Sequence, residues 1–119
     1  MDVIGSIREN LINNFNLTHE YLDTMIELTR QRIGIMSDVK KESIEMRGLS
    51  AVLQLAKERR LLIDINDANQ LMLLVDIAAW QYNAVDRVSR FDGSSNPAMP
   101  ADIRYRLNNA FVNTPQIGD

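Results

Sequence analysis

The sequence predicts an all-α protein: an antiparallel helical bundle of three main helices plus a short C-terminal helix. The first observation is that all three prolines lie near the C-terminal end, at positions 97, 100 and 115. Because proline removes a hydrogen-bond donor and clashes with the preceding helical turn, a long proline-free stretch can be helical throughout. The second observation is that apolar residues recur in that stretch at three- and four-residue spacing, which places them on one face of a helix.

Composition indicates one domain without disulfides. The chain has 119 residues, of which 45% are hydrophobic and 24% are charged, as in an ordinary globular domain with its own core. It has no cysteine, which excludes thiolate nucleophiles and cysteine–zinc sites. The N-terminus shows no signal-peptide pattern, and the most apolar window, 71–80, is too short to cross a membrane. We therefore expect a cytoplasmic protein, of a cell or of an infected host cell.

The first predicted helix follows from the most regular apolar stripe in the chain. The stripe consists of Ile4, Ile7, Leu11, Phe15, Thr18, Leu22, Met25, Thr29, Ile33 and Met36. Two ends are possible. Gly34 can cap the helix and Ser37 can begin a second one, which gives a helical hairpin. Alternatively, one helix of more than forty residues runs to Gly48 and is followed by a short helix.

Charge slightly favours the hairpin. Folding the chain back near residue 35 brings Asp23 towards Arg47 and Glu27 towards Lys41. Exposed ion pairs of this kind contribute only about 0–1 kcal/mol each, so they agree with a hairpin without establishing it.

The third main helix is predicted over residues 68–91. Asp67, followed three positions later by Gln70, reads as a capping box at its start. Apolar residues then occupy most of the helix surface, which indicates a helix that is buried on several sides. We expect it to be the central helix of the fold, or to face a second subunit.

The C-terminal part is divided by glycine and proline. Residues 1–92 are expected to form the bundle, and 93–100 to form a linker that begins at Gly93. Residues 101–112 have the pattern of a short amphipathic helix that packs on the bundle. Residues 113–119 are expected to be a frayed tail.

Candidate acid–base or metal-binding residues are few. His19 is the only histidine, and no second ligand lies one helical turn away. Glu20, Asp23 and Glu27 share one helix face, where a pair of carboxylates could act as acid and base if burial separated their pKa values. No apolar neighbours suggest such burial, and we expect a solvated face. The sequence thus predicts no catalytic residue, no metal site and no cofactor.

Basic residues are concentrated in segment 30–60, which has eight basic and four acidic residues. Such a segment could follow a phosphate backbone, which makes a nucleic-acid-binding regulator one alternative function. The segment lacks aromatic residues that could stack on bases, and we regard nucleic acid as a possible but disfavoured partner. The candidate residues for an anion or a nucleic acid are Arg30, Lys40, Lys41, Arg47, Arg59 and Arg60.

A second alternative is an enzyme that binds a small anion. In one long helix, Arg30 and Lys41 would lie three turns apart on one face, with Arg47 beyond them. A long helix, a short one and a third helix with Gln81 resemble the layout of the all-α chorismate mutases. That resemblance implies a dicarboxylate held between helices by Arg/Lys pairs and a glutamine. The Asp-x-x-Arg-Glu signature of that family is absent around residues 49–53, so the resemblance covers helix layout alone.

The sequence favours a non-enzymatic protein–protein interaction module over these alternatives. It combines abundant apolar helix surface with a lack of catalytic motifs, as expected of an adaptor, a secretion or assembly chaperone, or a structural subunit. We expect a homodimer or a higher oligomer and no membrane partner. The candidate interface residues lie on the third helix, where aromatic side chains could serve as anchors: Leu73, Ile77, Trp80 and Tyr82.

Overall fold

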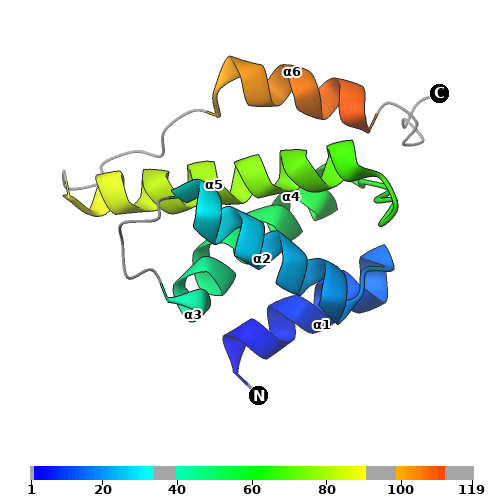
Figure 1. Ribbon diagram of the computed structural model, residues 1–119, viewed down its shortest axis with the longest axis horizontal. Helices are drawn as coiled ribbons and strands as arrows, with labels where there is room; N and C mark the ends of the chain where they lie inside the picture. The colour runs from blue at the N-terminus through cyan, green and yellow to red at the C-terminus, as the bar shows by residue number, and fades with distance from the viewer. Residues whose placement is uncertain (1, 34–39, 91–98, 112–119) are drawn as a thin grey trace.

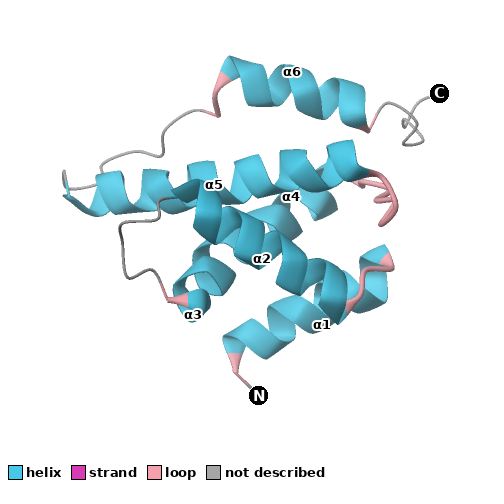
Figure 2. Cartoon of the chain, in the orientation of Figure 1, coloured by secondary structure: helices cyan, strands magenta, loops and turns pink. Residues whose placement is uncertain are grey.

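Helices form all the regular secondary structure in the described part of the chain, which confirms the predicted all-α bundle (Figures 1 and 2). The computed structural model describes residues 2–33, 40–90 and 99–111, and only the backbone of residues 84–90. The elements are α1 (Val3–Phe15), α2 (His19–Ile33), α3 (Lys41–Ile44), the π-helical segment η1 (Glu45–Leu49), α4 (Ser50–Arg59), α5 (Ala68–Arg90) and α6 (Ala101–Ala110).

The prediction of one continuous first helix is wrong, because the helix is interrupted between α1 and α2. Asn16 ends α1 in the left-handed conformation, with φ 59°. Thr18 then caps α2, since its Oγ1 accepts a hydrogen bond from the Tyr21 N–H at 3.0 Å. Asparagine tolerates the left-handed region and threonine is a favoured N-cap, so two local signals override the continuous apolar stripe.

The longer alternative, a helix that ends at Gly48, is also wrong. The structure has α2 end at Ile33 and a separate helical run begin at Lys41. Gly34 and Ser37, the predicted cap residues of the hairpin, lie outside the described residues. Gly48 does not stop a helix, since α3, η1 and α4 follow one another without a break from Lys41 to Arg59.

Helix α5 is the centre of the fold. α2, η1 and α4 pack on it from one side, and α6 lies along the other side (Figure 1). The middle of α5 is enclosed, with Leu74 and Val75 fully buried and Leu73, Ile77 and Ala78 each 1% exposed. The prediction of a central third helix is therefore confirmed, and other helices of the same chain bury the apolar residues in the middle of α5.

The start of α5 is tied to the end of α6. Asp67 Oδ1 accepts hydrogen bonds from the N–H groups of Asn69 and Gln70, as the predicted cap requires. The Gln70 side chain takes different partners from those of a capping box: Oε1 accepts from the Asp64 N–H at 2.8 Å, and Nε2 donates to the Ala110 carbonyl at 3.2 Å. Gln70 therefore joins the α4–α5 loop, α5 and α6.

Two ion pairs explain the presence of an acidic residue, Asp76, in the apolar part of α5. Its carboxylate pairs with Arg32 of α2 on one side and with Arg106 of α6, at 2.7 Å, on the other. Because Asp76 is only 15% exposed, these two cations compensate the loss of hydration that burial imposes on its charge.

Arg60 ends α4 in the left-handed conformation, which glycine adopts most often. Its φ is 52°, and the N–H of the next residue, Leu61, donates to the Ala56 carbonyl at 3.1 Å. This is a Schellman-type helix end, in which a non-glycine residue in the left-handed conformation costs about 1–2 kcal/mol.

The C-terminal segment agrees in part with the predicted boundaries. α6 runs from Ala101 to Ala110, within the predicted 101–112, and packs antiparallel to α5. Most of the predicted linker 93–100 and all of the predicted tail 113–119 lie outside the described residues.

The central position of α5 predicts a large cost for a cavity in it. Replacing the fully buried Leu74 with alanine should lower the free energy of unfolding by about 2–5 kcal/mol. Leu62→Ala is the matched control, because Leu62 is 57% exposed and should change stability by less than about 0.5 kcal/mol. Urea unfolding curves of both variants measure the difference, and equal midpoints would contradict this assignment of the core.

Candidate functional site

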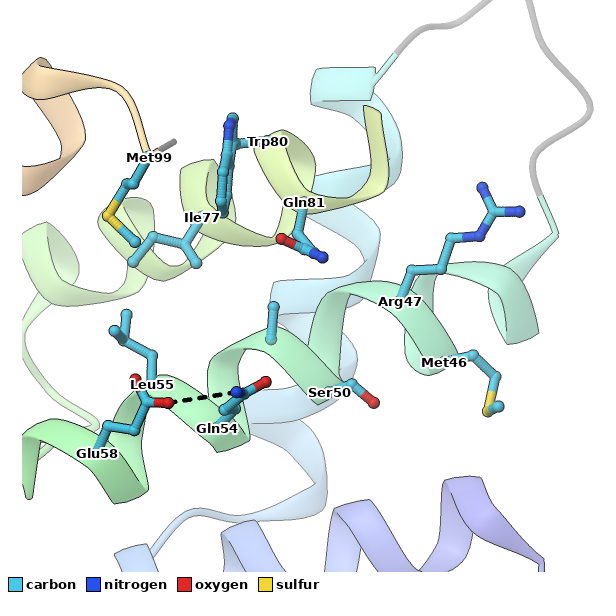
Figure 3. Close-up of a pocket in the computed structure, with 11 residues that line it drawn as sticks. Met46, Arg47, Ser50, Gln54, Leu55, Glu58, Ile77, Trp80, Gln81 and Met99 are labelled. Carbon is cyan, nitrogen blue, oxygen red and sulfur yellow. Dashed lines mark hydrogen bonds between the residues drawn. The ribbon is translucent and has the colours of Figure 1, made fainter. Parts of the chain in front are cut away.

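A groove between α4 and α5 combines apolar and polar side chains (Figure 3). Its volume is about 390 Å³. We call it the α4/α5 groove. Its lining comes from η1, α4, α5 and the residue that precedes α6: Met46, Arg47, Ser50, Ala51, Gln54, Leu55, Glu58, Ile77, Trp80, Gln81 and Met99.

Close packing at Gly48 holds one end of this groove. A Cβ atom at Gly48 would lie 3.0 Å from the Ala78 Cβ, so only glycine lets η1 approach α5 this closely. The π-helical turn adds one residue to the helical repeat, and such turns often occur at functional sites. In this chain it places Met46 and Arg47 at the groove.

The floor is apolar, one side carries Trp80 and Met99, and the other side carries polar residues. Ile77 and Leu55 form part of the floor, and Trp80 and Met99 stand at one side (Figure 3). Gln54 lies on the opposite side, where its Nε2 donates to Glu58 Oε2 at 3.2 Å. Methionine and tryptophan side chains beside an apolar floor are typical of surfaces that bind other proteins.

The four candidate interface residues separate into two kinds. Leu73 is 1% exposed and belongs to the core, whereas Ile77, also 1% exposed, lies at the floor of the α4/α5 groove. The sequence predicted that two neighbouring helices could not cover the apolar surface of α5. In the structure, α6 and η1 also pack on α5. Trp80 lines the α4/α5 groove, and Tyr82 lies beneath Arg47, whose guanidinium carbon is 4.8 Å from the ring centre.

Several residues of the groove were not identified from the sequence, chiefly Met46, Ser50 and Met99. A signal was available for three of the α4-side residues, because Met46, Ser50 and Gln54 recur every four positions and therefore share a helix face. Nothing in the sequence indicated that Met99 would reach this face.

The basic candidate residues do not form one patch. Lys40 and Lys41 lie at the start of the α3–α4 run, whereas Arg59 and Arg60 lie at its end, about 27 Å away at 1.5 Å per residue. Arg30 pairs with Glu27 at 3.0 Å, and Arg59 donates to Asn108 at 3.0 Å. The geometry therefore gives little support to a continuous phosphate-binding track.

The arrangement expected of a small-anion enzyme is not formed. Arg30 belongs to α2 and Lys41 to α3, so they are not three turns apart on one helix. Gln81 does line the α4/α5 groove, but Arg47 is the only one of the three predicted cations beside it among the described lining residues.

The residues of the ion pairs expected from a hairpin have other partners in the structure. Asp23 pairs with Lys41 at 3.8 Å and with Arg8 at 2.6 Å, while Arg47 lies over Tyr82. Glu27 pairs with Arg30 of its own helix. The register of α2 against the following helices therefore differs from the one that folding back near residue 35 predicts.

Arg8 is the centre of a polar cluster that the sequence did not reveal. Its side chain is 12% exposed, and its Nε donates to Glu45 Oε2 at 2.8 Å. The other guanidinium nitrogens contact Asp23 at 2.6 Å and His19 Nδ1 at 3.0 Å. Arg8 thereby joins α1, α2 and η1, and His19 has a structural partner.

The carboxylates of the predicted acidic face are not poised for acid–base catalysis. A hydrogen bond from Arg8 holds the pKa of Asp23 below its usual range, and Arg30 does the same for the pKa of Glu27. Glu20 is exposed in the first turn of α2. General acids near neutral pH need a raised pKa, so this face fits a solvated, structural role.

One buried hydroxyl group has no hydrogen-bond partner among the described residues. Tyr21 is 7% exposed, and burial, together with Asp67 and Asp64, raises the pKa of its phenol to about 12. The phenol therefore stays neutral, and it serves here as part of the core.

The described residues form no metal-binding cluster, and comparison with known proteins finds no match. In the described ranges, no three histidine or acidic side chains lie close enough to hold a metal ion. Nor does any helix in those ranges have both the length and the apolar character needed to span a bilayer. No protein-family model, curated protein or solved structure matches the chain.

The Arg8 cluster predicts a pH-dependent contribution to stability. Since the folded-state pKa of Asp23 is lowered, its contribution is present above the unfolded-state pKa of about 3.9 and is lost as the pH falls through the folded value. Asp23→Asn should lower stability at pH 7 by less than about 1 kcal/mol, because the Asp23 side chain is about half exposed. The difference from the native chain should shrink below about pH 4.

Urea unfolding at a series of pH values measures this effect. Glu20→Gln is the control, since it removes an exposed carboxylate from the same helix and should give a curve parallel to that of the native chain. A difference between Asp23→Asn and the native chain that stays constant from pH 7 to pH 2 would contradict the role of Arg8.

Proposed function

We propose that this chain is a non-enzymatic protein–protein interaction module, and that the α4/α5 groove is a self-association surface that joins two copies as a homodimer. This function suits an adaptor, an assembly chaperone or a structural subunit. The proposal is supported by the apolar floor, by the methionine and tryptophan side chains around it, and by the arrangement of charges along α4.

That arrangement of charges is the observation that carries the proposal. Arg47 and Glu58 lie near opposite ends of the face that α4 and η1 present to the groove. A two-fold axis between positions 52 and 53 would place α4 antiparallel to α4 of a second copy. Arg47 of one copy would then face Glu58 of the other, and Glu58 would face Arg47.

The same axis also pairs the other α4 residues of the groove. Ser50 would face Leu55, and Ala51 would face Gln54. The α4 side of the groove is thus complementary to itself, as a two-fold symmetric interface requires. The small residues at positions 50 and 51 would let the two helices approach closely.

Arg47 can serve both its own chain and the second copy. Its guanidinium lies over the Tyr82 ring, and its N–H groups lie in the guanidinium plane, where they can donate to a carboxylate. Stacking also restricts the side chain, so less conformational entropy is lost on forming the intermolecular pair.

Charge reversal tests this interface directly. We expect light scattering to find a dimer of the 13.6 kDa chain at micromolar concentration. Arg47→Glu and Glu58→Arg should each weaken dimerisation more than about tenfold, because each creates two like-charge pairs across the axis. The double variant Arg47→Glu/Glu58→Arg should recover the dimer.

Arg30→Glu is the matched control, since it reverses an exposed arginine on α2, outside the groove, and should leave the dimer intact. A native chain that stays monomeric up to millimolar concentration would overturn the proposal. So would a double variant that dimerises no better than the two single variants.

A further inference from the structure

A second groove lies between the ends of α1 and α4, on a different face of α4. Its volume is about 410 Å³, and we call it the α1/α4 groove. It is lined by Asn14, Phe15, Ala56, Lys57, Arg60, Leu61 and Leu62. Ala51 of the first groove and Ala56 of this one are five positions apart, which places them about 140° apart around the helix. A dimer through the α4/α5 groove would therefore leave this groove accessible.

The α1/α4 groove has an apolar floor that is built by the helix end itself. Ala56 and Leu61 are joined by the hydrogen bond that closes α4, and both are buried. Leu62 is 57% exposed beside them, and Phe15 closes the α1 side. Such an open hollow suits one or two aliphatic or aromatic side chains better than an enclosed ligand.

The charged residues among the described lining of this groove are all basic. Lys57 and Arg60 are both exposed, and no carboxylate is among the residues that line the groove. This is a local feature, because the whole chain has a formal net charge of −3. An acidic ligand would therefore be attracted to the α1/α4 groove, although the protein as a whole carries a net negative charge.

The backbone at Arg60 gives a second reason to consider its side chain functional. Arg60 occupies the left-handed position of a helix end, φ 52°, where glycine is the more stable choice. Arginine at this position places a guanidinium at the edge of the apolar floor, which a glycine could not do.

We propose that the α1/α4 groove binds an acidic amphipathic peptide segment of a partner protein. Its apolar side chains would pack on Leu61, Leu62 and Phe15, and its carboxylates would pair with Lys57 and Arg60. Binding at this groove does not depend on dimerisation through the α4/α5 groove.

Selection from a random peptide library tests the proposal, because it reports the chemistry of the ligand whatever the partner's sequence. The probe is a phage-displayed library of 16-residue peptides, selected on the native full chain and then synthesised for fluorescence anisotropy. We expect the selected peptides to combine Asp or Glu with aliphatic or aromatic residues, and to bind more weakly as salt concentration rises.

Variants then locate the site. Lys57→Gln/Arg60→Gly should weaken binding of the selected peptides more than tenfold, whereas Arg59→Gln, the adjacent arginine that contacts Asn108, should not. Because Arg60→Gly should leave the melting temperature at or above that of the native chain, loss of binding could not be attributed to unfolding.

Three results would overturn the proposal: no enriched peptide, enriched peptides without acidic residues, or equal binding to the double variant. Binding of phosphatidylglycerol vesicles that requires Lys57 and Arg60, without peptide binding, would also overturn it and indicate a lipid surface. Measuring peptide affinity on the Arg47→Glu variant separates the two proposals, since peptide binding should persist there whether or not the chain dimerises.

Discussion

The enclosure of α5 is the constraint on which the rest of the structure depends. A helix that is apolar on most of its surface must be covered on several sides, and this chain covers it with α2 and η1 on one side and α6 on the other. The closest approach is at Gly48, where η1 lies against Ala78. Asp76 and Gln70 then join α5 to its neighbours through polar contacts. Because other helices enclose the middle of α5, the two proposed binding surfaces lie on two different faces of α4.

Sequence patterns predicted the elements whose signals agree with one another. The predicted helix 68–91 has a cap and a broad apolar surface and is followed by a glycine, and α5 occupies Ala68–Arg90. The first helix was mispredicted because two kinds of signal conflict there. The apolar stripe continues through Phe15 and Thr18, but Asn16 and Thr18 favour a helix end and a helix start. The spacing of apolar residues indicates which helix face is buried, and a short interruption of the helix does not change that spacing.

The candidate site was predictable only in part, because it depends on which helices meet. Trp80 and Ile77 were identified as interface candidates and line the α4/α5 groove, whereas Leu73 is buried by helices whose positions the sequence does not specify. The basic residues of segment 30–60 are close in sequence but separated along a rigid helical run. Gly48 looked like a helix stop because its partner across the interface, Ala78, is thirty positions away.

Amide hydrogen exchange under native conditions tests the central claim most directly. If α5 is the enclosed centre of the fold, the amides of residues 73–79 should be the slowest to exchange, and they should open only with global unfolding in dilute urea. The amides of α1 and α6, which pack on the outside, should open at lower free energy. Amides of residues 73–79 that exchange as fast as those of α6 would contradict the account.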